Sequence, residues 1–260
     1  MAARNAPGGF TLVELAVVLA IVALLLGALL APLATQQSLR KNKEAERDLR
    51  EIKEALLGFA VANGRLPWPD RNFTPDGLEN IPGTVPSPPS SCTACEGRLP
   101  WRDLGLGAPD AWGRLYIYRI SSEFGYAVQT GQPAQPGQMD LTDAGTVRVN
   151  TRDEAKGDIV LTQDAAAVVV SLGSNGQGGG QLDGNVIPQA AAGTDERTNS
   201  DSSNPGPPTA HFYSRRITLP TSSGCSDTVA GSPYCEFDDL VMWIPRVVLI
   251  NWMVEAGRLP

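Results

Sequence analysis

Two patterns of apolar residues follow one another in the first quarter of the chain. Across residues 10–34 the only clearly polar side chains are Thr11 and Glu14. At a rise of about 1.5 Å per residue, a helix of this length crosses the ~30 Å hydrocarbon core of a bilayer. Residues 36–63 are rich in good helix formers and carry an amphipathic stripe, formed by Leu49, Ile52, Leu56, Phe59 and Asn63. We predict one long helix with a membrane half, residues 10–34, and an amphipathic half, residues 35–64.

The pattern changes to short β-branched and aromatic runs after this helix. Turn-rich stretches at residues 70–97, 173–184 and 193–208 are predicted to be loops. Strand signals fall at residues 115–120, 126–128, 146–149, 159–161, 165–172, 216–219 and 239–244, and helical spacing returns at residues 247–256. One helix followed by a strand series predicts the α+β class, with the helix packed on an antiparallel sheet. Residues 65–260 are then one globular domain with long loops.

Glu14 is the unusual residue of the apolar segment. A charged side chain costs roughly 2.5–3.5 kcal/mol at the centre of a membrane helix and less near its end, so a retained charge points to a function and a partner. A secretory signal peptide fits poorly, because the apolar run is long, only Arg4 is basic before it, and no small-residue cleavage site follows. A plain signal anchor with a stray glutamate stays the alternative.

The N-terminal residues resemble a known family. Gly9 and Phe10, followed by Thr-Leu-Val-Glu-Leu and an apolar helix, are similar to the processing site of type IV prepilins and of the pseudopilins of type II secretion. The resemblance implies that residues 1–9 are a leader, which a prepilin peptidase removes between Gly9 and Phe10 before it methylates the new amino group of Phe10. Glu14 would then neutralise that amine and set the register of neighbouring helices during assembly.

The resemblance also implies a location and partners. The leader would lie in the cytoplasm, the helix in the inner membrane and the globular domain in the periplasm, until the subunit joins other pilins or pseudopilins in a filament. Charges around the span leave the orientation open, because Arg4 precedes it while Arg40, Lys41 and Lys43 follow it. The large globular part favours a minor subunit. A formal net charge of −7 gives no indication of a nucleic-acid surface.

The cysteines favour a structural role. Two local disulfides, Cys92–Cys95 and Cys225–Cys235, are the simplest arrangement in an oxidising compartment, although four cysteines allow three pairings. The second loop is similar to the disulfide loop of many pilins. Cys92-x-x-Cys95 leaves a membrane-anchored thiol–disulfide protein as an alternative, but it lacks the strand-then-helix context that activates such a motif. A pilus-displayed adhesin using loops 74–91 and 193–208 is a further alternative.

Two internal stretches resemble the major pseudopilin. Residues 110–118, beginning Asp-Ala-Trp-Gly, are similar to its Asp-Pro-Trp-Gly segment, and residues 170–180 to its Ser-Leu-Gly-x-(Asp/Asn)-Gly loop. The resemblance implies a calcium site using oxygens of Leu172, Asn175 and Asp238, with Asp183, Asp195 and Asp239 as further carboxylates. Asparagine at 175 departs from aspartate, and a solvated glycine-rich turn is the alternative. We find no credible active site in the sequence and expect a structural protein rather than an enzyme.

Overall fold

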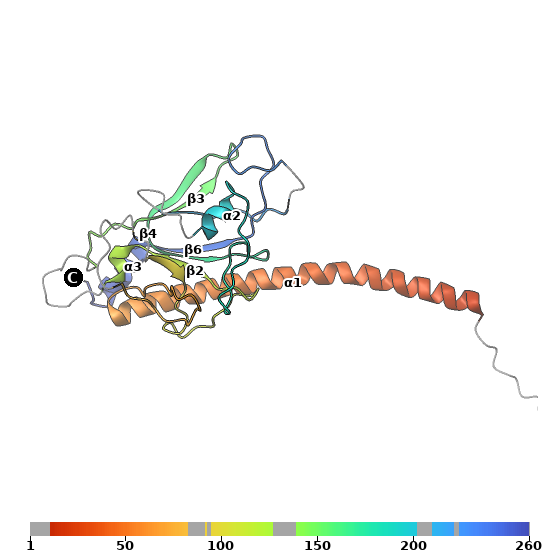
Figure 1. Cartoon of the computed structure of the whole chain (residues 1–260), viewed down its shortest axis with the longest axis horizontal. Helices are drawn as coiled ribbons and strands as arrows, with labels where there is room; N and C mark the ends of the chain where they lie inside the picture. The colour runs from red at the N-terminus through yellow and green to blue at the C-terminus, as the bar shows by residue number, and fades with distance from the viewer. Residues whose placement is uncertain are drawn as a thin grey trace, which may run out of the picture. The chain divides into compact units, whose positions relative to one another are not determined.

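The computed structural model describes residues 11–82, 92, 95–126, 139–201, 210–220 and 224–259, apart from the side chains of residues 26–35 and 210. The leader, Phe10 and most of loops 83–94 and 202–209 therefore lie outside the described residues. The chain divides into two compact units, Met1–Lys43 and Glu44–Pro260. The helices and strands, in order (Figure 1), are α1 (Leu12–Asn63), β1 (Glu96–Arg98), β2 (Ile117–Ile120), the 3-10 helix η3 (Ser122–Gly125), β3 (Val147–Arg152), β4 (Asp158–Ser171), α2 (Asp195–Ser200), β5 (Ala210–Tyr213), β6 (Leu240–Pro245) and α3 (Arg246–Glu255).

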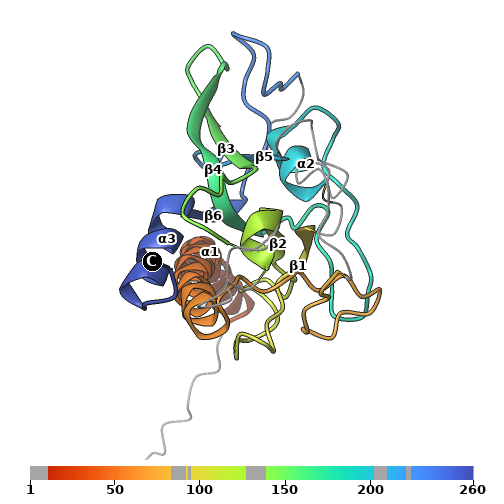
Figure 2. The ribbon, with the colours of Figure 1, turned by 90° about the vertical axis from the view of Figure 1, so that its left-hand side faces the viewer.

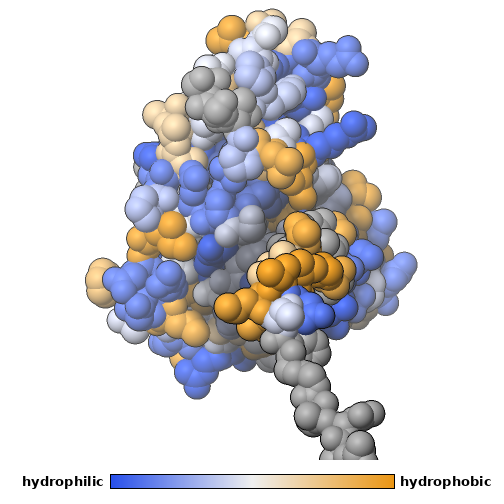
Figure 3. Space-filling model, turned by 90° about the vertical axis from the view of Figure 1, so that its right-hand side faces the viewer, coloured by the Kyte–Doolittle hydropathy of each residue, from blue (hydrophilic) through white to orange (hydrophobic). Residues whose placement is uncertain are grey.

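The first unit contains the start of α1. Its apolar side chains are exposed, from Leu12 at 86% to Leu25 at 59%. Figure 3 looks onto this end of the helix, where apolar residues gather on the surface. Among the described residues, no helix has the length and hydropathy of a candidate membrane span.

The rest of α1 belongs to the second unit and packs by the first part of its predicted stripe, whereas Phe59 is half-buried and Asn63 is exposed. Leu49, Ile52 and Leu56 are at most 5% exposed, and Ala45 and Ala60 are fully buried beside them. Gly64 ends the helix with φ of 74°, and its N–H donates to the carbonyl of Ala60 at 2.7 Å. A residue with a Cβ is strained at this left-handed position, which is why glycine follows so many helices.

Strand β4 is the centre of a curled, six-stranded sheet (Figure 2). It pairs antiparallel with β2, β3 and β6, while β1 extends the sheet from β2. Strand β5 pairs with β3 in parallel, so the sheet is mixed rather than wholly antiparallel. The α+β class predicted from the sequence, a long N-terminal helix followed by a sheet, is confirmed and is consistent with a pilin-like fold.

Several boundaries differ from the predictions. Residues 159–161 and 165–172 form the single strand β4, and residues 216–219 contribute only an isolated bridge, Thr218 to Phe237. Strand β1 and helix α2 arise in stretches that we predicted to be loops, and β5 was not predicted. The candidate strand at 126–128 lies largely outside the described residues.

The sheet has a core on each face. On one face, Tyr118, Ile120, Ala167 and Val169 pack with α1 and α3. On the other, Val168, Val170, Val149 and Phe212 form a smaller cluster. Trp68 is fully buried in the first core and donates from its indole N–H to the carbonyl of Gly125 at 2.8 Å.

Candidate functional site

Glu14 lies in the first turn of α1 and is held by Thr11. Oε2 of Glu14 accepts from the backbone N–H of Thr11 at 2.8 Å and from its hydroxyl at 2.9 Å. The hydroxyl oxygen in turn accepts from the N–H of Glu14 at 3.3 Å. This reciprocal arrangement is a capping box, which satisfies donors that the first turn leaves without helical partners. An exposed carboxylate is thus positioned at the start of an apolar helix, four residues after Phe10, which with Gly9 lies outside the described residues.

The structure joins both local cysteine pairs. The Cα atoms of Cys92 and Cys95 are 5.4 Å apart, and those of Cys225 and Cys235 are 4.9 Å apart. Cys92 is 2% exposed and Cys95 is 1% exposed, and both belong to the core beneath α1. Disulfide exchange requires an accessible sulfur. Burial of both sulfurs therefore favours a structural bond over the thiol-enzyme alternative.

The Cys225–Cys235 loop is tied to α2 by buried charges. Asp227 accepts from the backbone N–H of Cys235 at 3.0 Å and from the N–H of Asp195 at 2.9 Å. Arg215 lies between the two carboxylates, 2.8 Å from Asp195 and 3.1 Å from Asp227. Burial raises the pKa of Asp195, and the Arg152 guanidinium opposes that rise. These carboxylates are committed to arginines, so Asp195 is a structural residue and not an available metal ligand.

Two stretches that resemble the major pseudopilin come together in space. Oδ2 of Asp110 accepts from the Ser171 hydroxyl at 2.7 Å. The Arg114 guanidinium donates to the carbonyls of Gly173 at 2.6 Å and Ser174 at 3.0 Å. Segment 110–118 thus fixes the beginning of residues 173–184, the glycine-rich loop that follows β4.

Three carboxylates gather beside this loop. Glu196, Asp238 and Asp239 each place an oxygen within 4.8 Å of the others. Burial raises the pKa of Glu196 to about 7, while a hydrogen bond from the Asp238 backbone N–H opposes that rise and the Asp238 charge adds to it. Burial also raises the pKa of Asp239 well above its ordinary value. Hydrogen bonds hold the group: Oδ2 of Asp238 accepts from the backbone N–H groups of Ser174 and Asn175 at 2.8 and 2.9 Å.

The predicted calcium ligands lie partly in this cluster. Asp238 and Asn175 are adjacent, since Asp238 accepts from the N–H of Asn175. The carbonyl of Leu172, the third predicted ligand, instead accepts from the N–H of Gly176 at 2.9 Å. The Asn175 amide donates to Glu196 at 3.1 Å, and Glu196 was not predicted. Oδ1 of Asp238 is buried without a hydrogen-bond partner among the described residues. The donor set is made of oxygens, and an orphaned carboxylate oxygen within it fits a hard cation.

Asp183, another carboxylate considered from the sequence, does not belong to this cluster. It accepts instead from the backbone N–H of Asn185 at 2.9 Å within its own turn. The sequence signal for Glu196 is Thr194, a residue type that often begins helices. In the structure its hydroxyl accepts from the N–H of Arg197 and caps the start of α2. A short helix there turns its first acidic residues toward the loop.

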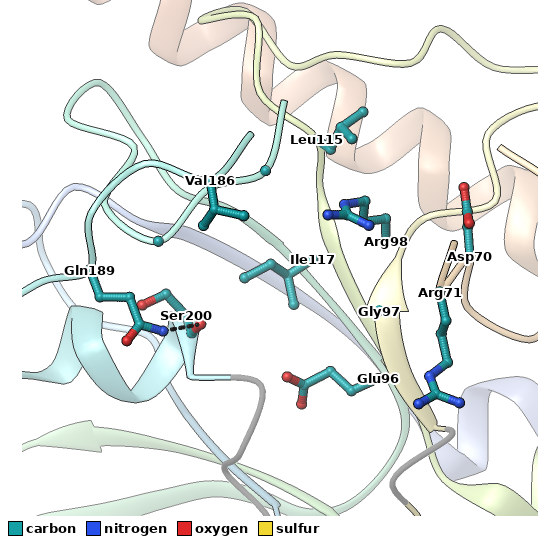
Figure 4. A pocket seen from close by; sticks show the side chains of 12 residues that line it. Asp70, Arg71, Glu96, Gly97, Arg98, Leu115, Ile117, Val186, Gln189 and Ser200 are labelled. Carbon is teal, nitrogen blue, oxygen red and sulfur yellow. Dashed lines mark hydrogen bonds between the residues drawn. The ribbon is translucent and has the colours of Figure 1, made fainter. Parts of the chain in front are cut away.

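A separate cavity of about 450 Å³ lies between β1 and the glycine-rich loop. In Figure 4, Glu96, Arg98 and Ile117 line one side, and Val186, Gln189 and Ser200 line the other. The Gln189 amide donates to the carbonyl of Ser200 at 3.3 Å. Among its described lining residues there is no nucleophile paired with a base, so the cavity shows no catalytic arrangement.

These features, a helix with an N-terminal carboxylate followed by an α+β domain with internal disulfides, are consistent with a pilin-like fold. Residues 4–30 match the family model described as the prokaryotic N-terminal methylation motif. This motif is the signature of type IV pilins and pseudopilins, and it points to a structural protein. No curated protein and no solved structure matches the chain.

Proposed function

We propose that this chain is a structural subunit of a type IV pilus or a type II secretion pseudopilus. A prepilin peptidase cuts between Gly9 and Phe10, methylates the amino group of Phe10, and the mature subunit assembles with other pilins or pseudopilins through α1. The match of residues 4–30 to the methylation motif is the observation that carries the proposal. The exposed apolar residues at the beginning of α1 support it, since they need lipid or neighbouring helices around them.

Glu14 is the assembly residue in this proposal. Its carboxylate already reaches the N–H of Thr11, one residue from the amine that cutting would create. In a low-dielectric surrounding an unmatched carboxylate is expensive, and removal of one partner of a buried ion pair costs about 3–5 kcal/mol. An amine from a neighbouring subunit would satisfy the carboxylate only at one helical stagger. Assembly and register thereby depend on the same ion pair.

The test separates processing from assembly. We expect Glu14→Ala to be cut and methylated normally, which mass spectrometry of the N-terminus reads, but to be absent from sheared filaments or crosslinked pseudopili. Glu44→Ala is the matched control, because Glu44 is an exposed carboxylate on the same helix. Normal incorporation of the Glu14→Ala variant would refute the role of Glu14. A mature protein that still begins at Met1 would refute the whole proposal.

The proposed location is the inner membrane, with the globular domain in the periplasm. Disulfides at Cys92–Cys95 and Cys225–Cys235 support an oxidising compartment. Reporter fusions after residue 260 test this: alkaline phosphatase should be active and a cytoplasmic reporter inactive. The reverse result would place the domain on the cytoplasmic side.

We also propose a calcium ion between Asp238 and Glu196, favoured by the orphaned Oδ1 of Asp238. Bound calcium would neutralise these carboxylates and hold the glycine-rich loop on α2. Calorimetric titration of the full chain in detergent micelles with CaCl₂ should give one site. Glu196→Gln and Asp238→Asn should weaken binding at least tenfold, whereas Asp183→Asn should not. Absence of binding by the unmodified chain at millimolar calcium would exclude the site.

A further inference from the structure

Strand β6 presents an edge with which no other described strand pairs. It pairs with β4 along one side only, and no other described strand joins it. Its residues Leu240, Val241, Met242, Trp243 and Ile244 carry no charge, and only Pro245 closes its end. Natural proteins usually protect sheet edges with charges, prolines or bulges, because an unprotected edge is a template for another strand.

A groove runs along this edge within the Glu44–Pro260 unit. It has a volume of about 540 Å³ and lies between β6 and the later part of α1, which run beside each other in Figures 1 and 2. Leu49 contributes an apolar wall from α1, and residues 240–243 of β6 line the other side. A groove beside an open edge offers backbone hydrogen bonds together with pockets for alternate side chains.

The rim of the groove carries two cations without partners. Arg50 is exposed and Lys53 is half-buried, and neither forms an ion pair or hydrogen bond with the described residues. The other arginine in the lining, Arg215, is already paired with Asp195 and Asp227. Lysine in such a position rests its apolar stem on the protein and keeps its ammonium at the surface, where an anion supplied from outside can meet it.

Two acidic groups also line the groove, but neither neutralises these cations. Asp239 is buried and accepts from the Asn199 amide at 2.9 Å. Glu46 is exposed one turn before Arg50 and makes no ion pair with it in the described chain. Arg50 and Lys53 outnumber Glu46 among the unpaired groups of this lining, so the net unpaired charge beside the edge is positive.

We propose that an extended, acidic segment of a partner protein adds as a strand to the open edge of β6 and places its carboxylates against Arg50 and Lys53. Every second side chain of the segment would point toward α1, where the two cations accept acids. The apolar side chains between them would point to the other face, beside Val241 and Trp243. A second copy of this chain fits less well, because edge-to-edge pairing of two β6 strands would bring two cationic rims into one interface. The proposal does not depend on assembly through the N-terminal helix.

Synthetic peptides test the proposal on the full chain in detergent micelles. Fluorescence polarisation would measure binding of three labelled heptapeptides: the alternating acidic peptide TVEVEVT, its lysine counterpart TVKVKVT, and TVEPEVT, whose proline removes a strand donor. We expect the acidic peptide to bind at least tenfold more tightly than the other two. Equal binding of the three, or no binding of the acidic peptide at millimolar concentration, would overturn the proposal.

Charge reversal on the rim gives the matched comparison. The double variant Arg50→Glu with Lys53→Glu should lose the acidic peptide at least tenfold and prefer the lysine peptide. Arg47→Glu is the control, because Arg47 is 70% exposed on the same helix and does not line the groove. If Arg47→Glu weakened the acidic peptide as much, the attraction would be general and the assigned groove wrong. If sedimentation showed a dimer that the double variant abolished, a second copy would be the occupant instead.

Discussion

The buried ion pair between β1 and β2 makes a quantitative prediction. Glu96 and Arg119 face each other in the strand register, with Oε2 and Nη1 2.8 Å apart and side chains 6% and 5% exposed. Nε of Arg119 is buried without an acceptor among the described residues. Burial raises the pKa of Glu96 above its ordinary value, and the nearby Arg119 charge offsets only part of that rise. The pair is thus held at a high desolvation cost.

Arg119→Met should reveal that cost. Removing one partner of a buried pair destabilises by about 3–5 kcal/mol. In a domain of this size each kcal/mol shifts the melting temperature by about 2–4 °C, so the fall should be roughly 10 °C. The carboxylate of Glu96 titrates near 4.5 in the unfolded chain and higher in the fold. Ionisation of Glu96 therefore lowers the stability of the fold as pH rises through the folded pKa. Without Arg119 no nearby positive charge offsets the burial of the carboxylate, so the loss is larger. The defect should shrink as the pH is lowered toward 5.

Urea unfolding of the full chain in micelles, followed by tryptophan fluorescence at pH 5 and pH 7, measures both effects. The double variant Glu96→Leu with Arg119→Met should lie within about 1 kcal/mol of the unmodified protein, because an apolar pair removes the desolvation cost. Arg47→Met is the control, since its exposed pair with Asp48 should contribute less than about 1 kcal/mol. A loss for Arg119→Met below about 1 kcal/mol at both pH values would show that the pair is solvated, and the reasoning would fail.

Three further predictions concern stability. Trp68→Ala should cost about 3–5 kcal/mol, because the indole is fully buried, and Trp68→Phe clearly less; urea midpoints compare the two. Burial lowers the pKa of His211, with the Arg148 charge contributing. The neutral form of His211 is therefore favoured in the fold, and its contribution to stability is present above pH 6.5 and lost as pH falls through the folded pKa. The His211→Gln variant should lose less stability between pH 7 and pH 5 than the unmodified protein does. Replacing Cys225 and Cys235, 10 residues apart, by serine should cost about 2–3 kcal/mol through loop entropy, and an unchanged melting temperature would contradict this.

Long periodic patterns were read correctly because many residues repeat the same signal. The stripe at Leu49, Ile52 and Leu56 faces the core, since each step of three or four residues returns to one side of the helix. Residues 240–245 and 246–255 form the last strand and helix close to the predicted bounds.

Short elements were missed because their stability comes from distant partners. Strand β1 has three residues, and its place is set by pairing of Glu96 with Arg119 in β2, which no local pattern encodes. Strand β5 lies parallel to β3 because Phe212 packs into the second core, and parallel pairing needs a long crossover that composition does not reveal. Glu196 was likewise overlooked because α2 sits in a polar, glycine-rich context.

The central position of β4 has a consequence for folding. Its buried residues 165–170 pair with β2, which precedes β4 in the chain, and with β6, which follows about 70 residues later. The hydrophobic middle of the sheet therefore stays uncovered until both strands have paired with β4. Non-local pairing of this kind is slow and leaves intermediates open to aggregation. One apolar strand of the newly made polypeptide therefore stays exposed to solvent or to other chains until the sheet closes around it.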